Sequence, residues 1–304
     1  MDFQKILEQI QEDTQKYFGI GEVANYIPEL AKVNPNQFAM TVATVDGDIY
    51  SVGASQQRFS IQSISKVIVF AMALEQIGER LFQRVGKEPS GSSFNSLIQL
   101  EQEQGIPRNP FINAGALVST DEIIKNNKDA YEAILNFVRE VSLSADIDYD
   151  FKVSSSELET ADRNRALAFF MKSFGNIQGD VMMLVDVYCH HCSLSMTTEE
   201  LSKLFLFLAN KGVNPLNGQR VVSEYQAKRV NAMMLTCGLY DNVGSFAYEV
   251  GMPAKSGVGG GITGVIPGHL SVSVWSPELN ASGNSLVGTK ALELFSELTD
   301  LTIF

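Results

Sequence analysis

A serine and a lysine three residues apart are the first side chains in this sequence that could do chemistry. Ser63 and Lys66 lie in "FSIQSISKVIVFAMAL", where a long apolar run follows the lysine at once. Residues i and i+3 share one face of a helix, and a segment that is apolar all round indicates a buried helix. Ser63 is then expected at the helix N-terminus, where free backbone N–H groups can bind an oxyanion. A capping serine and a lysine whose ammonium reaches solvent would explain the same pattern without catalysis.

A second lysine motif favours the catalytic interpretation. Lys255-Ser256-Gly257 precedes a glycine run and a strand pattern in "PAKSGVGGGITG", and we expect it on an edge strand. S-x-x-K and K-[S/T]-G are two of the three marks of serine β-lactamases and penicillin-binding proteins. The third mark is S-D-N or Y-x-N. Tyr240-Asp241-Asn242 has the spelling but lies only shortly before Lys255, so Tyr188, on a predicted helix, is the better positional candidate.

The run Cys189-His190-His191-Cys192 follows Tyr188 and contains residue types that bind metals. Four contiguous residues cannot readily surround one zinc ion, and no distant Cys/His pair completes a site. The remaining cysteine and histidine, Cys237 and His269, are single. We therefore predict no metal and no cofactor.

Charge and hydropathy exclude several classes of protein. The chain has 304 residues and a net charge of −12, without a Lys/Arg cluster, so we expect no nucleic-acid partner. The N-terminus lacks the pattern of a signal peptide. The longest apolar runs have about eight residues, whereas a membrane span needs roughly 20. Three sparse cysteines are typical of a reducing compartment. These features predict a soluble, cytoplasmic protein without a membrane partner.

The elements that must position these residues follow from periodicity. An amphipathic helix pattern opens the chain, and Asp46-Gly47 between two β-rich runs predicts a hairpin. Helical patterns dominate until about residue 235, one of them with Thr198 as a candidate cap, and strand patterns and a last helix follow. We predict an α+β fold in one catalytic domain. An α/β lobe (1–62 and 245–304) would hold a mainly antiparallel sheet flanked by helices, a large all-helical lobe would span 63–244, and the site would lie between them.

Several stretches resemble the serine-dependent glutaminase family and follow its order along most of the chain. They include "VANYIPELAKV", "TVATVDGDIYSVG", "FSIQSISKV", "NPFINAGA", "ETADRNRALA", "VDVYCHHCS", "TCGLYD" and "GMPAKSGVGGG". The resemblance implies a serine β-lactamase/D,D-peptidase-like fold and a homo-oligomer, a dimer or tetramer. It implies hydrolysis of L-glutamine to L-glutamate and ammonia without a cofactor. The histidines of "YCHHCS" depart from the family, where an aromatic residue and a glutamine are more usual.

The resemblance also implies roles for single residues. Ser63 matches the nucleophile and Lys66 its general base, and we add Tyr188 as proton relay and Lys255 as the cation that helps Lys66 to lose its proton. The positions that match substrate-binding residues are Tyr26, Ser63, Asn113, Glu157, Asn164, Tyr188, Tyr240 and Val258. Val258 is expected to act through its backbone N–H.

The chemistry of glutamine fits these residue types. Glu157 suits the α-ammonium group, and the amides of Asn113 and Asn164 suit the α-carboxylate. A free lysine has a pKa of about 10.4, so Lys66 must be buried or lie near another cation to act as a base near neutral pH. The alternative is a β-lactamase or D,D-peptidase-like acyl hydrolase, which the missing export signal disfavours. A third hypothesis is a binding module without activity.

Overall fold

The computed structural model describes residues 1–90 and 97–304. The central feature of this described part is a five-stranded sheet with the strand order β3-β2-β9-β8-β7, in which every neighbouring pair is antiparallel. Its strands are β2 (Ala39–Thr44), β3 (Ile49–Gly53), β7 (Ala254–Gly257), β8 (Gly261–Ile266) and β9 (Leu270–Trp275). Because β2 pairs with β9, both ends of the chain contribute to one sheet, which confirms that prediction.

Two local predictions about the sheet are also confirmed. β2 and β3 form a hairpin whose turn contains Gly47 at a φ of +96°, in the left-handed region that glycine adopts without strain. Strand β7, which carries Lys255, lies at one edge of the sheet. Within β7, Lys255 pairs with Thr263 of β8.

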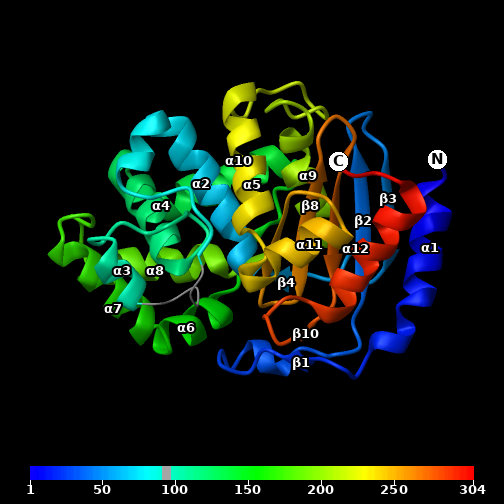
Figure 1. Ribbon diagram of the computed structural model, residues 1–304, viewed down its shortest axis with the longest axis horizontal. Coiled ribbons are helices and arrows are strands. Elements are labelled where there is room, and N and C mark those ends of the chain that lie inside the picture. Colours follow the sequence, from blue (N-terminus) through cyan, green and yellow to red (C-terminus); the bar gives the residue numbers. More distant parts are fainter. Residues whose placement is uncertain (91–96) are drawn as a thin grey trace.

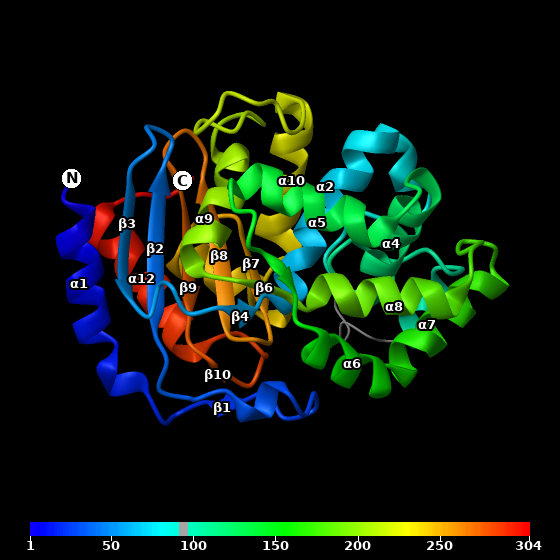
Figure 2. The same ribbon diagram turned by 180° about the vertical axis from the view of Figure 1, so that it is seen from behind.

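Helices cover both faces of the sheet. Figure 1 shows α11 (Val243–Glu249) and α12 (Leu286–Thr299) in front of the sheet, with α1 (Phe3–Asp13) beside α12. Leu7 and Ile10 of α1 are fully buried in the core that these helices form with the sheet. In Figure 2 the other face is in front, and α9 (Thr198–Ala209) lies across it, packed on β2, β8 and β9. The sheet is therefore the middle of three layers.

The start of α9 differs from the predicted cap by one residue. Thr197, not Thr198, is the N-cap, because Thr197 has the extended backbone that a cap needs and its hydroxyl accepts a hydrogen bond from the Glu200 N–H. The Glu200 carboxylate accepts the Thr197 N–H in return, which completes a capping box.

The remaining helices lie beside the sheet and enclose a second apolar core. They are α2 (Ser65–Ile77), α3 (Leu97–Gln102), α4 (Asn113–Asn126), α5 (Ala130–Ser142), α6 (Phe151–Glu159), α7 (Asp162–Ser173), α8 (Val181–Cys192) and α10 (Glu224–Cys237). Helix α9 falls within the range that we assigned to the helical lobe, although it packs on the sheet. The division into two lobes at the predicted boundaries stays a prediction.

Short elements connect these layers. Single-turn 3-10 segments are η1 (Gln15–Tyr17), η2 (Leu30–Lys32), η3 (Gln62–Ile64) and η5 (Tyr240–Asn242), and η4 (Gly78–Gln83) is longer. Short strands in the described ranges are β1 (Glu22–Val23) with β10 (Glu278–Leu279), and β4 (Phe59–Ser60), β6 (Leu194–Met196) and β5 (Asp148–Tyr149). The predicted α+β class, with a mainly antiparallel sheet and many helices, is confirmed.

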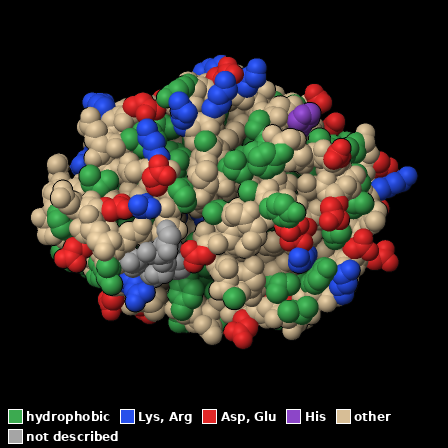
Figure 3. Space-filling model, viewed as in Figure 1, with side chains coloured by type: hydrophobic (Ala, Val, Ile, Leu, Met, Phe, Trp, Pro, Cys, Tyr) green, Lys and Arg blue, Asp and Glu red, His purple; other side chains and the backbone are tan. Residues whose placement is uncertain are grey.

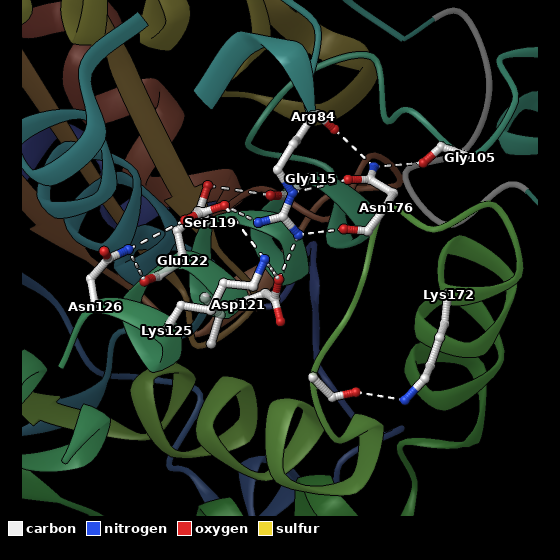
Figure 4. A network of polar contacts seen from close by, with 12 residues as sticks. Arg84, Gly105, Gly115, Ser119, Asp121, Glu122, Lys125, Asn126, Lys172 and Asn176 are labelled. Carbon is white, nitrogen blue, oxygen red and sulfur yellow. Dashed lines mark hydrogen bonds and ion pairs between the residues drawn. The ribbon is translucent and has the colours of Figure 1, made fainter. Parts of the chain in front are cut away.

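A network of ion pairs, largely buried, involves two carboxylates of α4 (Figure 4). The Arg84 guanidinium contacts the carboxylates of Asp121, at 2.5 Å, and of Glu122. It also donates to the Asn176 carbonyl oxygen, and Lys125 lies 3.0 Å from Asp121. Two carboxylates on α4 are thus neutralised by two cations, and α4 is tied to the segment after α7.

The surface carries charges of both signs. On the face in Figure 3, lysines and arginines lie among aspartates and glutamates. In the described part of the chain, no helix combines the length and the apolar character that crossing a membrane requires.

Candidate active site

A cavity of about 330 Å³ opens where η3, α4, α6, α7, α8 and η5 meet. All the positions predicted to bind substrate lie in its wall, together with a few further residues. The wall consists of Tyr26, Ile27, Gln62, Ser63, Asn113, Glu157, Thr160, Ala161, Arg163, Asn164, Tyr188, Tyr240 and Val258. Lys66 and Lys255 are fully buried behind this wall.

Ser63 lies in η3, the tight turn that leads directly into α2. The helix itself begins at Ser65, two residues later than expected. Gln62 precedes the serine with a φ of +48°, which is a strained backbone conformation for a residue other than glycine. Gly257 explains how strand β7 can pass so close to this turn. A Cβ atom at residue 257 would lie 2.3 Å from the Ile61 carbonyl oxygen and 3.2 Å from the Ser63 nitrogen.

Lys66 does not reach solvent. Its Nζ donates to Oδ1 of Asn113 at 2.6 Å and to the carbonyl oxygen of Phe111 at 3.4 Å. Burial lowers the pKa of Lys66 to about 8, because the charged ammonium loses its hydration. The alternative of a lysine that extends to the surface is therefore wrong, and about a tenth of this amine is neutral at pH 7.

Tyr240 links the serine to the second lysine motif. Burial raises the pKa of Tyr240 to about 12, and the side chain of Ser63 close to its hydroxyl, with that of Ser256, opposes this shift. Lys255 lies behind it, with Nζ 4.6 Å from the centre of the Tyr240 ring and 2.7 Å from the Ser256 carbonyl oxygen. Burial, and then the charge of Lys66, lower the pKa of Lys255. Lys255 and Ser256 thus support Tyr240, and Tyr240 contacts the serine.

Tyr188 lies on α8, as predicted, and is buried. The Lys66 ammonium is 5.8 Å from the centre of its ring. Burial raises the pKa of Tyr188, and the Cys192 thiol one helical turn further on adds to this shift. Tyr188 and Tyr240 both lie in the cavity wall with Ser63, and the proton relay assigned to Tyr188 stays a prediction.

Glu157 provides the negative charge of the cavity. It lies near the end of α6, and Nε2 of Gln62 donates to its carboxylate at 3.3 Å. Burial raises the pKa of Glu157 to about 7, although the Gln62 amide and the Lys66 charge oppose this shift. A buried carboxylate with so few partners suits a cationic ligand group.

Asn113 and Asn164 provide amides at two helix N-termini. Asn113 is the first residue of α4, and Asn164 lies in the first turn of α7. The ammonium form of Lys66 can only donate, so it fixes Oδ1 of Asn113 towards itself, and Nδ2 of Asn113 donates to Oδ1 of Asn164 at 2.9 Å. The Asn164 Nδ2 group and the free N–H groups of both helices favour an anion at this end of the cavity.

Sequence reasoning missed Gln62, which contacts Glu157 and adjoins Ser63. The only signal was its position beside the serine, since nothing in the sequence predicts its left-handed backbone. The arginine and threonine of the wall, Arg163 and Thr160, were also missed.

The run from Cys189 to Cys192 forms no metal centre within the described residues, where no suitable group of three or more ligands occurs. Both ring nitrogens of His191 are instead within hydrogen-bond distance of hydroxyls, Ser65 and Thr120. The cysteines are free thiols.

Comparison with known proteins decides the family. A profile described as Glutaminase matches residues 21–304. The chain belongs to the glutaminase family. It is 52% identical over 304 residues to a glutaminase of Ralstonia nicotianae, and 51% identical over 305 residues to one of Aliarcobacter butzleri, with 100% of each chain covered. As a member of the glutaminase family it is a glutamine amidohydrolase, and the family match favours this activity over the β-lactamase or D,D-peptidase alternative.

Solved structures of the glutaminase family have the same fold. The probable glutaminase ybaS is 37% identical, with a TM-score of 0.92 over 99% of this chain and 98% of the other. A probable glutaminase from Bacillus subtilis, complexed with 6-diazo-5-oxo-L-norleucine, is 33% identical, with a TM-score of 0.90 over 100% and 98%. The fold is therefore β-lactamase-like, as the resemblance implied.

Proposed function

We propose that this protein hydrolyses L-glutamine to L-glutamate and ammonia through an acyl-enzyme on Ser63, with Lys66 as general base. The observation that carries the proposal is the cavity itself. It combines a serine next to a buried, partly neutral lysine with a carboxylate on one side and amide donors on another. The Bacillus subtilis relative complexed with 6-diazo-5-oxo-L-norleucine supports an α-amino acid ligand of glutamine length.

Binding would use the two charged groups on the α-carbon of the substrate. The Glu157 carboxylate accepts the α-ammonium, and the amides of Asn113 and Asn164 donate to the α-carboxylate. The side-chain amide of glutamine then extends towards Ser63. Asparagine is one methylene shorter, and a methylene is worth about 1–3 kcal/mol of discrimination, so we expect moderate selectivity against it.

Acylation forms one bond and breaks another. The Ser63 oxygen attacks the amide carbon while neutral Lys66 takes the hydroxyl proton. The backbone N–H groups of Ser63 and Val258 stabilise the oxyanion. When the C–N bond breaks, the proton returns to the departing nitrogen through a neighbouring hydroxyl, that of Tyr240 or Tyr188, and ammonia leaves. A γ-glutamyl ester on Ser63 remains.

Deacylation repeats these steps with water. Lys66, neutral again, takes a proton from the water that attacks the ester carbon, and the same N–H groups hold the oxyanion. The ester C–O bond breaks, Ser63 regains its proton and glutamate is released. No step requires a metal or an organic cofactor.

The test is direct. The protein is incubated with L-glutamine, ammonia and glutamate are measured, and intact mass spectrometry after rapid acid quenching looks for a γ-glutamyl adduct. We expect both products in equal amounts and no release by Ser63→Ala. Product release by Ser63→Ala at the wild-type rate would reject the serine mechanism, and no release by the wild-type protein would reject the activity.

We also propose a cytoplasmic homo-oligomer, a dimer or tetramer. Exposed large apolar side chains support association, among them Phe169 and Phe174 around the end of α7 and Met182 at the start of α8. Light scattering coupled to size exclusion should give a mass of two or four chains, and fractionation of the producing cells should find the protein with cytoplasmic markers.

A further inference from the structure

His191 joins two helices behind the proposed nucleophile. It lies on α8 and is fully buried. Its Nδ1 lies 2.7 Å from the Ser65 hydroxyl at the first residue of α2, and its Nε2 lies 3.1 Å from the Thr120 hydroxyl in α4. One imidazole ring thus spans the helix that carries Lys66 and the helix that begins with Asn113.

The hydroxyl protons in this cluster are fewer than the acceptors. Ser65 has one proton, and Oγ lies 2.8 Å from the Gln62 carbonyl oxygen, which competes with Nδ1 of His191. Thr120 likewise has one proton for Nε2 of His191 or the Ala116 carbonyl oxygen, 2.8 Å away. Burial lowers the pKa of His191 to about 3, so the ring is neutral and donates from one nitrogen only. One of the two hydroxyls must therefore donate its proton to the ring, and that hydroxyl then makes no hydrogen bond to its backbone carbonyl.

The two backbone carbonyls, of Ala116 and Gln62, differ in how well other hydrogen bonds already satisfy them. Ala116 lies within α4, where a regular helical hydrogen bond satisfies its carbonyl group. The Gln62 carbonyl oxygen accepts the backbone N–H of Ser65 in a 3-10 turn, whose hydrogen bonds have poorer geometry than those of an α-helix. Gln62 is also the residue with the strained φ of +48°, and a strained residue persists only where its surroundings hold it. A hydrogen bond from the Ser65 hydroxyl to the Gln62 carbonyl oxygen should therefore stabilise the structure more than one from the Thr120 hydroxyl to the Ala116 carbonyl oxygen.

We propose that His191 is a positioning residue for the reaction at Ser63. It donates from Nδ1 to the Ser65 oxygen, so that the Ser65 hydroxyl donates to the Gln62 carbonyl oxygen and fixes the turn that presents Ser63. Thr120 donates to Nε2. The same turn orients the Gln62 side chain, which donates to Glu157. This inference rests on Ser63 being the nucleophile.

Amide substitutions separate the two ring nitrogens. The amide of His191→Asn lies near the position of Nδ1 and can donate to Ser65, whereas that of His191→Gln lies near the position of Nε2 and Thr120. We expect kcat of His191→Asn to stay within about threefold of wild type, and kcat of His191→Gln and His191→Leu to fall at least about tenfold with KM within about twofold.

His190 provides a matched control on the same helix. Its Nδ1 lies 2.9 Å from the Asp186 carbonyl oxygen, and its ring packs edge-on against Tyr131 and Tyr149, away from Ser65. We expect His190→Leu to lower the melting temperature and to leave kcat unchanged. A fall of kcat in His190→Leu comparable to that in His191→Leu would mean that general softening of α8 explains both.

A second readout reports on Ser63 without turnover. The rate of covalent labelling by 6-diazo-5-oxo-L-norleucine is followed by intact mass, with Ser63→Ala as the blank. We expect labelling to slow in His191→Gln and His191→Leu but not in His191→Asn. Because His191 acts through Ser65, Ser65→Ala combined with His191→Leu should lower kcat no further than the larger single effect.

The outcomes distinguish this inference from the proposed function. If the wild-type protein neither releases ammonia nor is labelled at Ser63, both are rejected. If it does both while His191→Gln and His191→Leu keep the wild-type kcat and labelling rate, only the positioning role is rejected. The same holds if the losses in Asn, Gln and Leu variants follow melting temperature alone, or if the Ser65 and His191 effects are additive. Should His191→Leu not fold, the Asn and Gln pair decides.

Discussion

Nζ of Lys66 lies 2.6 Å from Oδ1 of Asn113. This contact has a consequence for the base, because a carboxylate in place of the amide would stabilise the ammonium form of the lysine. An opposite charge at this distance shifts a pKa by about 1–3 units. We expect Asn113→Asp to move the rising limb of the kcat profile to higher pH by at least about one unit, as measured by ammonia release from pH 5 to 10.

The matching control for that variant is Asn164→Asp. It adds the same charge to the same cavity, but Asn164 contacts Asn113 and not Lys66 in the described structure. Both variants should raise KM, since a second carboxylate repels that of the substrate, whereas the shift in the kcat profile should be larger for Asn113→Asp. Equal shifts of the kcat profile in the two variants would contradict the assignment of Lys66 as the base.

The pH dependence of KM and kcat in the wild-type protein should reflect the ionisation of two buried groups, Glu157 and Lys66. Glu157, with a pKa of about 7, must be ionised to accept the α-ammonium group, so KM should fall as pH rises through 7. Lys66, with a pKa of about 8, must be neutral to act as base, so kcat should rise until about pH 8 and then level off. A kcat profile that is flat from pH 6 to 9 would contradict the assignment of Lys66.

Two tyrosines can be compared as partners of the serine. Tyr240→Phe removes the hydroxyl close to Ser63 but keeps the ring beneath Lys255. A proton-transfer group contributes roughly 10²–10⁴-fold, so we expect kcat to fall by at least about a hundredfold. Tyr188→Phe removes a hydroxyl whose pKa responds to Cys192 and not to Ser63, and it should cost less. If Tyr188→Phe costs more than Tyr240→Phe in steady-state assays, the relay originally predicted for Tyr188 is favoured.

Features with a local cause were the ones that sequence could predict. Ser63 and Lys66 lie three residues apart before a buried helix, and Asp46-Gly47 forms its hairpin, because spacing and turn chemistry act over a few residues. The edge strand with Lys255 followed from its flanking glycines. The cap of α9 was missed by one residue because two threonines are adjacent.

Features that depend on long-range packing were not predictable. The hydrogen bond of Lys66 to Asn113 and the approach of Tyr240 to Ser63 join segments that are far apart in the chain and meet only when the helices pack on the sheet. The left-handed backbone of Gln62 has the same origin. Glu157 and Asn164 are isolated polar residues in helical patterns, so composition and periodicity alone would have left them unassigned; the resemblance named them.

The burial that makes Lys66 a base should also cost stability. Its pKa is lowered from 10.5 to about 8 in the folded state, which corresponds to about 3 kcal/mol at one unit per 1.36 kcal/mol. This destabilisation of the folded state is fully present below pH 8. It decreases as pH rises and is absent above the unfolded pKa of 10.5. We expect Lys66→Met to be inactive but at least as stable as wild type below pH 8, with the advantage shrinking towards pH 10 in thermal unfolding. A large loss of stability at pH 7 would contradict this account.

The Arg84 network offers a test of stability far from the cavity. Asp121 is 1% exposed and Glu122 is 7% exposed, so Arg84→Met leaves two buried carboxylates whose remaining cation, within residues 1–90 and 97–304, is Lys125. Removing one partner of a buried ion pair costs about 3–5 kcal/mol, which chemical denaturation would measure. Combining Arg84→Met with Glu122→Gln should restore part of the loss, because one uncompensated charge is removed. Lys172→Ala is the control, since Figure 4 shows Lys172 apart from the contacts of Arg84, and its ammonium donates to the Gly179 carbonyl oxygen. A change below about 1 kcal/mol in Arg84→Met, similar to that of the control, would show that the network is dispensable.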